Sequence, residues 1–286
     1  MRTAFTEEYE LDIPVASAGM AFVARAELVA AVSAAGGIGV LGGSAMPPAL
    51  LEQEIAAVRA ATDRRFGVNF IARFCQPEHI ALCANLRVPV VSFFWDNPER
   101  AWVEELHAAG ARVWMQVGSV DEAAGAVEMG ADLVIAQGIE AGGHNRSTAA
   151  TFCLVPAVVD MIAPVPVLAA GGIADGRGVV AAVALGADGA WIGTRFLASA
   201  EADAHRDYKA RLVGAGPRGG GRGPPPLPPP GGGAPPSHPP GAARRRGRPR
   251  YGPAQGVRLG LPGRAGPGTS QPDRCRARRR RSAPAL

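Results

Sequence analysis

The sequence predicts an α/β protein with a closed (β/α)8 barrel, or TIM barrel, over residues 1–213, and three observations support this fold class. Short β-branched runs alternate with Ala-rich segments of helical period, and the unit recurs about every 20 to 30 residues. The runs are apolar on both faces, as parallel strands covered by helices must be. Eight units in about 210 residues match barrels of this kind, which begin near about 200 residues. A doubly wound open sheet is the alternative.

The eight expected strands are runs rich in Val, Ile, Leu, Phe and Ala. Each is shorter than the roughly 10 residues that a helix normally needs, and each precedes a segment of helical character. The expected strands are residues 13–17, 38–41, 66–70, 89–93, 112–117, 133–137, 165–169 and 190–193.

The segments between and after these strands are predicted to be helices. They cover residues 26–35, 49–61, 77–86, 98–109, 121–129, 154–162, 176–185 and 201–212. Four of them end on a glycine suited to a left-handed C-cap, and two begin after a side chain that can cap the first turn. The six capping residues are Gly36, Gly110, Gly130, Gly186, Ser119 and Asp175.

The composition changes abruptly after residue 213. Residues 214–286 hold 17 of the 26 prolines, 17 of the 38 glycines and 15 of the 30 basic residues, with one acid, so their net charge is +14. They contain no Ile, Phe, Trp or Met, and we expect this low-complexity basic tail to be disordered. It is either a Pro/Arg-rich arm, able to attract nucleic acid or a proline-recognising domain, or a frameshift product of GC-rich codons. The sharp break directly after a helical segment favours the frameshift.

Charge and cysteine usage restrict the function of residues 1–213. They carry 15 basic and 24 acidic residues, a net charge of −9, which does not suggest nucleic-acid binding. The chain's four cysteines lack zinc-site spacing and are too sparse for a disulfide framework, so we expect no metal and a reducing compartment. The acidic start lacks signal-peptide features, and no apolar run reaches about 18 residues. We therefore expect a soluble, cytoplasmic protein with no membrane partner.

The candidate chemistry lies directly after the expected strands, because active sites of these barrels form at the carboxyl ends of the strands. After the sixth strand, residues 137–146 read QGIEAGGHNR and bring Gln137, Glu140 and His144 into one turn. Gly142 and the glycine after it let the backbone approach a flat ligand closely. We interpret His144 as catalytic rather than as a structural histidine of its own loop.

The segments after the seventh and eighth strands indicate a phosphate site. They read AAGGIADGRG over 169–178 and WIGTRF over 191–196. In many barrels, glycine amides and a helix start at this place bind a phosphate dianion, and Gly172, Gly193 and Thr194 supply such groups. No GxGxxG follows the first strand, which argues against a Rossmann fold. A phosphate-bearing planar cofactor beneath one histidine suggests flavin mononucleotide (FMN).

Five segments in the same order give the chain a specific resemblance. They are AVSAAGGIGVLGG (31–43), GVNF (67–70), AQGIEAGGH (136–144), AAGGIADGRG (169–178) and GADGAWIGTRFLAS (186–199). Over about residues 13–212 the sequence resembles the nitronate monooxygenases of the 2-nitropropane dioxygenase family.

This resemblance implies an FMN-dependent oxidoreductase with His144 in the catalytic position. The implied flavin contacts are Met20, Asn69, Gln137, Gly142, Gly172, Trp191, Ile192, Gly193 and Thr194. The implied reaction is oxidation of a small alkyl nitronate by flavin through single-electron transfer, after which O2 yields a carbonyl compound and nitrite. His144 would act as a base toward a neutral nitroalkane, or hold the nitronate anion as a cation.

The chain departs from the family pattern in three places. Ala18, Gly19 and Met20 stand where Ala-Pro-Met is usual, Arg146 stands where a glycine is frequent, and residues 214–286 replace structured chain that helps to cover the site. Two alternatives stay open. One is an NADH- or NADPH-dependent flavin reductase of the enoyl-acyl-carrier-protein or quinone reductase type. The other is a non-enzymatic protein that binds nucleic acid through its basic tail.

Several other residues have simpler interpretations. Glu140 either braces its loop or acts at the site. We expect Cys153 to be a buried small hydrophobe, and residues 93–95, which end in Trp95, to be core or to line a substrate pocket. Three further histidines are expected to be solvated: His79, His107 and His205.

Overall fold

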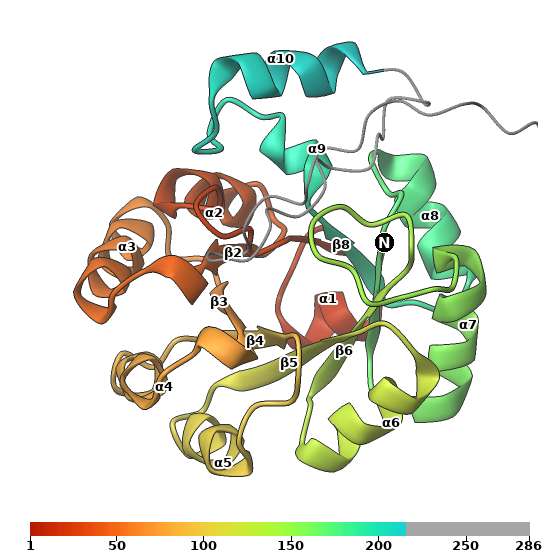
Figure 1. Cartoon of the computed structure of the whole chain (residues 1–286), viewed down its shortest axis with the longest axis horizontal. Helices are drawn as coiled ribbons and strands as arrows, with labels where there is room; N and C mark the ends of the chain where they lie inside the picture. The colour runs from red at the N-terminus through yellow and green to blue at the C-terminus, as the bar shows by residue number, and fades with distance from the viewer. Residues whose placement is uncertain (216–286) are drawn as a thin grey trace, which may run out of the picture. The chain divides into compact units, whose positions relative to one another are not determined.

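The computed structural model describes residues 1–215, which form a ring of eight parallel strands surrounded by helices (Figure 1). The order around the sheet is β1-β8-β7-β6-β5-β4-β3-β2, so strands that follow one another in the chain lie side by side. The strands are β1 (Val15–Ser17), β2 (Gly39–Gly42), β3 (Phe66–Ile71), β4 (Val90–Phe94), β5 (Arg112–Val117), β6 (Leu133–Gln137), β7 (Val167–Ala170) and β8 (Gly189–Ile192).

Helices connect the strands on the outside of the ring, and α1 lies across its opening (Figure 1). The longer helices are α2 (Ala26–Ala34), α3 (Pro48–Ala61), α4 (Pro77–Asn85), α5 (Arg100–Ala108), α6 (Val120–Met129), α7 (Thr151–Ile162), α8 (Gly176–Ala184) and α10 (Arg206–Gly214). The short ones are α1 (Ala4–Glu8), η1 (Gly43–Ala45), η2 (Ala72–Phe74) and α9 (Thr194–Leu197).

The predicted TIM barrel is confirmed, and each strand end lies within two residues of its expected position. Helix α7 begins at Thr151 rather than at residue 154, and α10 begins at Arg206 rather than at residue 201. The four short helices were not expected, because five residues or fewer are too few to show a helical period.

The expected helix caps are confirmed. The Ser119 side chain accepts a hydrogen bond from the Glu122 amide at 3.2 Å, and Asp175 accepts one from the Arg177 amide at 3.0 Å. The four C-cap glycines have φ between +83° and +103°, a left-handed conformation that glycine adopts without steric cost. These local signals place the helix ends correctly.

The ring closes through a narrow seam between β1 and β2. One parallel bridge joins Ala16 to Ile38, just before β2 begins. The Ser17 amide donates to the Ile38 carbonyl and the Ile38 amide donates to the Val15 carbonyl, both at 3.0 Å. In addition, the Ser17 hydroxyl accepts a hydrogen bond from the Val40 amide at 3.3 Å. A side-chain oxygen therefore replaces a main-chain partner at the end of the seam.

The interior of the barrel is apolar toward the amino ends of the strands, where α1 closes it. Phe5 and Tyr9 insert from this end and pack against the buried Trp114 ring at centroid distances of 5.6 and 5.2 Å. The Trp114 Nε1–H donates to the Tyr9 hydroxyl at 2.8 Å, so the buried indole is satisfied. Thr3 ties α1 to the start of β8 by donating to the Asp188 carbonyl at 2.6 Å. Phe5 of α1 and Tyr9, which directly follows α1, thus fill the barrel interior at the amino ends of the strands.

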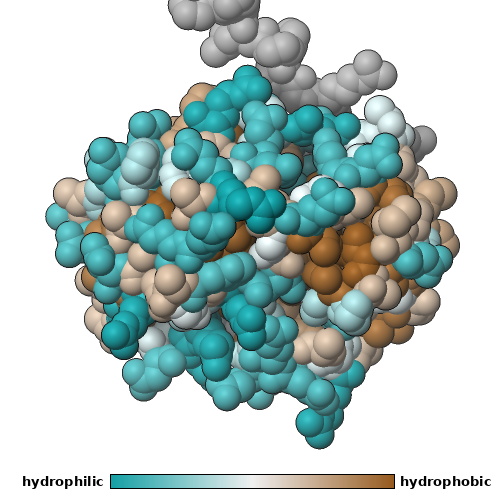
Figure 2. Space-filling model, turned by 90° about the horizontal axis from the view of Figure 1, so that it is seen from below, coloured by the Kyte–Doolittle hydropathy of each residue, from teal (hydrophilic) through white to brown (hydrophobic). Residues whose placement is uncertain are grey.

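A second core lies between the strands and the surrounding helices. Helix α5 illustrates its origin, because Val103 and Leu106 face the sheet while charged residues of the same helix face solvent. Figure 2 shows the resulting surface from below the view of Figure 1, with hydrophilic residues over most of this face and one hydrophobic area at its right-hand side.

Two further observations concern expectations about the whole chain. The basic tail expected over residues 214–286 lies, from residue 216 on, outside the described residues. Within residues 1–215, no helix combines the length and the apolar character that crossing a bilayer requires.

The packing of α1 leads to a prediction about stability. Phe5→Ala should lower the free energy of unfolding by about 3–5 kcal/mol, because it leaves a cavity in a fully buried site between α1 and Trp114. Urea unfolding followed by tryptophan fluorescence measures this change. The control is Phe152→Ala on α7, where the ring is 68% exposed, and the expected change is below about 0.5 kcal/mol. Equal effects of both substitutions would contradict the role given to α1.

Candidate active site

Polar side chains form the upper layer of the barrel interior, at the carboxyl ends of the strands. Ser92, Gln116 and Gln137 each follow an apolar interior residue by two positions, and therefore face the same side of the sheet. Asn69 on β3 joins them, because its Nδ2 donates to the Ser92 Oγ at 2.9 Å. The interior thus changes from apolar to polar toward the end at which barrels of this kind carry their sites.

Gln137 is the member of this layer that points most directly to a ligand. Its side chain is buried, yet no atom of the described residues makes a hydrogen bond with its Oε1. A buried acceptor without a partner is costly, so a ligand N–H or O–H placed here would be bound favourably. The interpretation of Gln137 as a ligand-binding residue is consistent with this geometry.

The loop after β1 brings Met20 to the mouth of the barrel. A Cβ at Gly19 would lie 2.2 Å from the Asn69 Cβ, so this loop can cross Asn69 only with glycine at that position. The departure from the family pattern at Gly19 therefore has a steric reason. Met20 Sδ lies 3.6 Å from the position that a Cβ of Gly193 would take. Residues 20 and 193, far apart in the sequence, lie together at the mouth.

The loops after β6, β7 and β8 converge at the same end. A Cβ at Gly142 would lie 3.2 Å from the Thr194 Oγ1, so these two predicted site residues are neighbours. Gly172 has a φ of +72°, and a Cβ added to it would lie 3.6 Å from the Cβ of Glu140. Gly193 is the residue that precedes α9, whose first residue, Thr194, is exposed. Backbone amides and one hydroxyl are therefore available where a phosphate was expected.

Trp191 and Ile192 differ from the other predicted contacts. Trp191 is buried on the inner face of β8, with its ring 6.2 Å from that of Trp114, and Ile192 faces outward toward Val179 of α8. Their side chains therefore belong to the two cores. The Ile192 side chain points away from the barrel interior, so only its main-chain groups remain as candidates for contact with a ligand, whereas the inward-facing Trp191 lies in the same layer as Gln137.

His144 is exposed at the tip of the loop between β6 and α7. Its imidazole lies edge-on against the ring of Trp95, with 4.4 Å between the centroids and an angle of 62° between the planes. Asn145 closes the loop on itself, because its Nδ2 donates to the Gly138 carbonyl and its Oδ1 accepts from the Ser147 amide, both at 2.8 Å. The catalytic candidate thus stands on an ordered loop beside an aromatic wall.

Glu140 braces the base of this loop. Its carboxylate accepts hydrogen bonds from the Thr151 amide at 2.8 Å and from the Thr151 hydroxyl at 2.9 Å. Burial alone would raise the pKa of Glu140, but these hydrogen bonds to the charged form outweigh it and lower the pKa. Of the two interpretations left open for Glu140, the structure favours the one in which it holds the loop.

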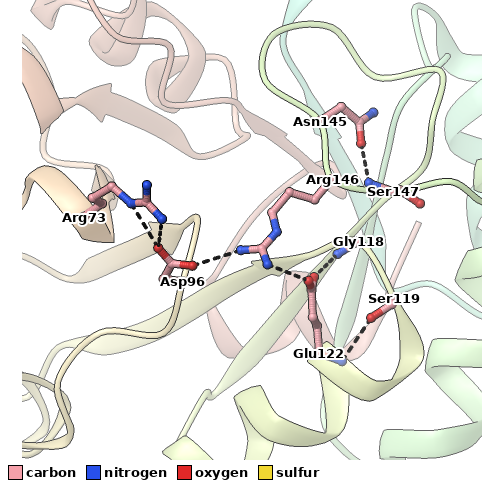
Figure 3. Close-up of polar contacts among 8 residues, drawn as sticks. All are labelled: Arg73, Asp96, Gly118, Ser119, Glu122, Asn145, Arg146 and Ser147. Carbon is pink, nitrogen blue, oxygen red and sulfur yellow. Dashed lines mark hydrogen bonds and ion pairs between the residues drawn. The ribbon is translucent and has the colours of Figure 1, made fainter.

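Arg146 joins the His144 loop to two neighbouring loops (Figure 3). Its guanidinium lies 3.1 Å from the Asp96 Oδ1 and 3.4 Å from the Glu122 Oε1. The other oxygen of Asp96 accepts from Arg73 at 3.0 Å, and the Glu122 Oε2 accepts from the Gly118 amide at 2.7 Å. Hydrogen bonding to Arg73, and more weakly to Arg146, lowers the pKa of Asp96. Four loops at the carboxyl end of the barrel are connected by this network.

Two clefts of the described residues bear on the position of the site. A cleft of about 230 Å³ lies beside the network and is lined by Trp95, Asp96, Asn97, Gln116, Glu122 and Arg146. A larger one of about 560 Å³ lies at the opposite, amino-terminal end of the strands, where Arg112 pairs with both Glu8 and Asp132. We take the smaller cleft as the candidate substrate cleft because it adjoins the residue that contacts His144.

Some simpler interpretations need correction. His79 is buried rather than solvated, with its Nε2 2.9 Å from the Met46 carbonyl and its Nδ1 accepting from the Gln76 amide at 3.1 Å. Cys153 is exposed rather than buried, because it lies on the outer side of the first turn of α7. His107 and His205 are more than one-third exposed, as expected, and His107 pairs with Asp132.

Sequence reasoning missed Ser92, Gln116 and the Asp96–Arg146 pair. Ser92 and Gln116 could have been found from the two-residue alternation of their strands, counted upward from the buried aliphatic positions. Of residues 93–95, Phe93 is core, whereas Trp95 lines the smaller cleft. No local pattern indicates the Asp96–Arg146 pair, because 50 residues separate its members in the chain.

Comparison with known proteins gives relatives with two kinds of name. A 5-hydroxy-7a-methyl-1-oxo-octahydro-1H-indene-4-carboxyl-CoA dehydrogenase of Rhodococcus jostii is 40% identical over 217 residues, which are 76% of this chain and 61% of the relative. A probable nitronate monooxygenase of Staphylococcus aureus is 33% identical over 253 residues, covering 73% of this chain and 71% of the relative. This chain thus spans about three-fifths of the length of the Rhodococcus protein.

Solved structures that match this chain also carry two kinds of name. FabK from Thermotoga maritima matches with a TM-score of 0.70 and 43% identity, over 74% of this chain and 68% of that one. A nitroalkane oxidase from Streptomyces ansochromogenes matches with a TM-score of 0.69 and 31% identity, over 75% of this chain and 73% of that one. The family model described as nitronate monooxygenase matches residues 2–78 and 72–218. With the barrel, the polar mouth and these matches taken together, the chain belongs to the nitronate monooxygenase family of oxidoreductases.

Proposed function

We propose that this protein is an FMN-dependent enzyme that oxidises small alkyl nitronates with O2 to a carbonyl compound and nitrite. The observation that carries the proposal is the pairing of an exposed imidazole, His144, with a buried amide that lacks a partner, Gln137, at the mouth of a barrel of this family. The His144 imidazole can transfer a proton or bind an anion, and the Gln137 Oε1 can accept a hydrogen bond from an N–H of a planar ring.

The residues at the mouth fit a flavin mononucleotide. Gln137 offers a buried acceptor to the ring, while Asn69 and Met20 line the same end of the barrel from β3 and from the loop after β1. Gly142, Gly172, Gly193 and Thr194 bring main-chain amides and a hydroxyl together without bulky side chains, which suits a phosphate. We assign Ile192 a role through its main chain only, whereas Trp191 can also contribute its inward-facing ring.

His144 would take the proton from the carbon next to the nitro group of a neutral nitroalkane, leaving the nitronate anion and a protonated imidazole. With a preformed nitronate, a protonated His144 would hold the anion instead. The flavin, when bound, supplies the redox chemistry by accepting electrons from the nitronate. Trp95 gives this position an apolar wall on one side, which suits a short alkyl chain.

A thioester-linked reaction is the second candidate function. It is favoured by one specific observation, namely that relatives named as a carboxyl-CoA dehydrogenase reach 40% identity, against 33% for those named as probable nitronate monooxygenases. The flavin reductase that uses NADH or NADPH, with an enoyl thioester or a quinone as acceptor, belongs to this candidate. Both functions use the same flavin site and differ in the substrate that reaches it.

The role of His144 leads to a prediction about turnover. His144→Ala should keep the yellow cofactor, because the phosphate would be bound by main-chain amides and the Thr194 hydroxyl, which the substitution leaves in place. It should lower kcat with neutral nitroalkanes by about 100-fold or more, the usual contribution of a general base. The effect with a preformed nitronate should be smaller. Steady-state nitrite release with both substrates provides the measurement, and identical kinetics in variant and parent would remove His144 from the mechanism.

The two candidate functions predict opposite responses to a nicotinamide. Under anaerobic conditions, a nitronate monooxygenase should keep the visible absorbance of its oxidised flavin when NADH or NADPH is added. The same protein should release nitrite when nitronate and O2 are supplied. Stopped-flow bleaching by either nucleotide, without nitrite release from nitronate, would favour the reductase. The measurement therefore decides between the functions directly.

Gln137 provides a prediction about cofactor binding. Gln137→Leu should raise the Kd for FMN about two- to tenfold, because a neutral hydrogen bond to the ring is lost while the site keeps its volume. Quenching of flavin fluorescence during titration of the apoprotein measures the Kd. The matched control is Gln53→Leu on the exposed side of α3, for which the Kd should not change. A Gln137→Leu variant that binds FMN as tightly as the parent protein would remove this contact from the proposal.

A further inference from the structure

We propose that the Asp96–Arg146 ion pair positions His144, and that it acts on the imidazole through Trp95. The inference rests on the role of His144 proposed above, and it adds three positioning residues that the family pattern does not indicate. Four observations carry it: an unusual backbone turn, a shared carboxylate, a ring contact and the absence of net charge in the network.

The turn after β4 has an unusual conformation. Trp95 and Asp96 have φ values of +57° and +65°, and both are non-glycine residues in the left-handed region. This region is disfavoured for side chains with a Cβ, and two successive residues there need compensation from surrounding contacts. Such backbone strain is concentrated at functional sites. The turn brings Trp95 against His144. It also places Asp96 between Arg73 and Arg146 (Figure 3).

The carboxylate of Asp96 provides this compensation. Its Oδ2 accepts from Arg73 of η2, at 3.0 Å from Nη2 and 3.3 Å from Nε, and its Oδ1 accepts from Arg146 at 3.1 Å. Each oxygen therefore binds a separate guanidinium, from the loop after β3 and from the loop after β6. The strained turn is fixed from both sides by charge-assisted hydrogen bonds.

Both ends of the ion pair reach His144. Trp95 directly precedes Asp96 and packs edge-on against the imidazole at 4.4 Å, while Arg146 follows His144 by two residues. A shift of the Asp96 carboxylate would therefore move the aromatic wall and the loop together. Without these contacts the His144 loop would keep the hydrogen bonds of Asn145 and Glu140 at its base, but the imidazole itself would lose the ring beside it.

Charge balance argues against the simpler role for Arg146, which is attraction of an anionic substrate. Arg146 faces Asp96 and Glu122, and Asp96 also faces Arg73, so the network contains two cations and two anions. The guanidinium is thus neutralised by groups of the protein itself. Its contribution is geometric: it fixes where the His144 loop stands relative to the loops after β4 and β5.

The test follows the ring signals of His144 by NMR in the full chain with 13C-labelled histidine, and His144→Ala assigns them. Trp95→Ala removes the ring current of the indole and should shift these signals. Asp96→Asn and Arg146→Gln should each shift them in the same direction, and the double variant should shift them no further than the larger single effect. Arg146→Lys, which keeps the charge, should return the signals toward their parent positions.

Turnover gives a second readout. Asp96→Asn should lower kcat about tenfold with little change in KM, because a misplaced catalytic group loses rate rather than binding. The matched control is Asp12→Asn, which breaks the exposed Asp12–Arg64 pair of 2.6 Å at the amino end of the barrel and should leave both readouts unchanged. His144 signals that stay in place in Asp96→Asn and Arg146→Gln would overturn the inference, whatever the kinetics. Shifted signals in a protein without nitronate turnover would uphold the positioning role and refute the proposed function instead.

Discussion

The closure of the strand ring is the constraint on which the rest of this structure depends. Once eight parallel strands form a ring, every second side chain must point inward, and all the carboxyl ends open on one side. Aromatic residues of α1 and β5 fill the inner space at one end, and the polar layer of Asn69, Ser92 and Gln137 occupies the other. Residues from seven separate loops, those after β1 and after β3 to β8, can meet at this end only because the ring brings them there.

The sequence was sufficient for most of the fold. Repeated alternation and capping residues identify the strands and helix ends because these signals are local. Helix α1 was missed, since the burial of Phe5 arises from the barrel and not from a five-residue pattern. The same reason explains His79: its helical position was correct, but the direction of its face depends on packing against Phe70.

The structure brings the main-chain groups of the predicted site together, whereas the direction of the side chains was harder to anticipate. Gly142, Gly193 and Thr194 follow strand ends, which are easy to locate in the sequence, and the structure brings these residues close together. The side chains of Trp191 and Ile192 lie in two different cores, because successive residues of a strand face opposite sides of the sheet. The connection from Asp96 to Arg146 spans 50 residues and starts from a turn without glycine. Its existence depends on the relative placement of loops, and no property of either segment alone indicates it.

The seam between β1 and β2 has a consequence for motion. Every other neighbouring pair in the ring has at least three residues in register, whereas this pair shares the single Ala16–Ile38 bridge. Fluctuations that open a closed cylinder begin where the fewest bonds must break. Strands β1 and β2 should therefore separate first, next to the Met20 loop, while the other neighbouring strands stay paired.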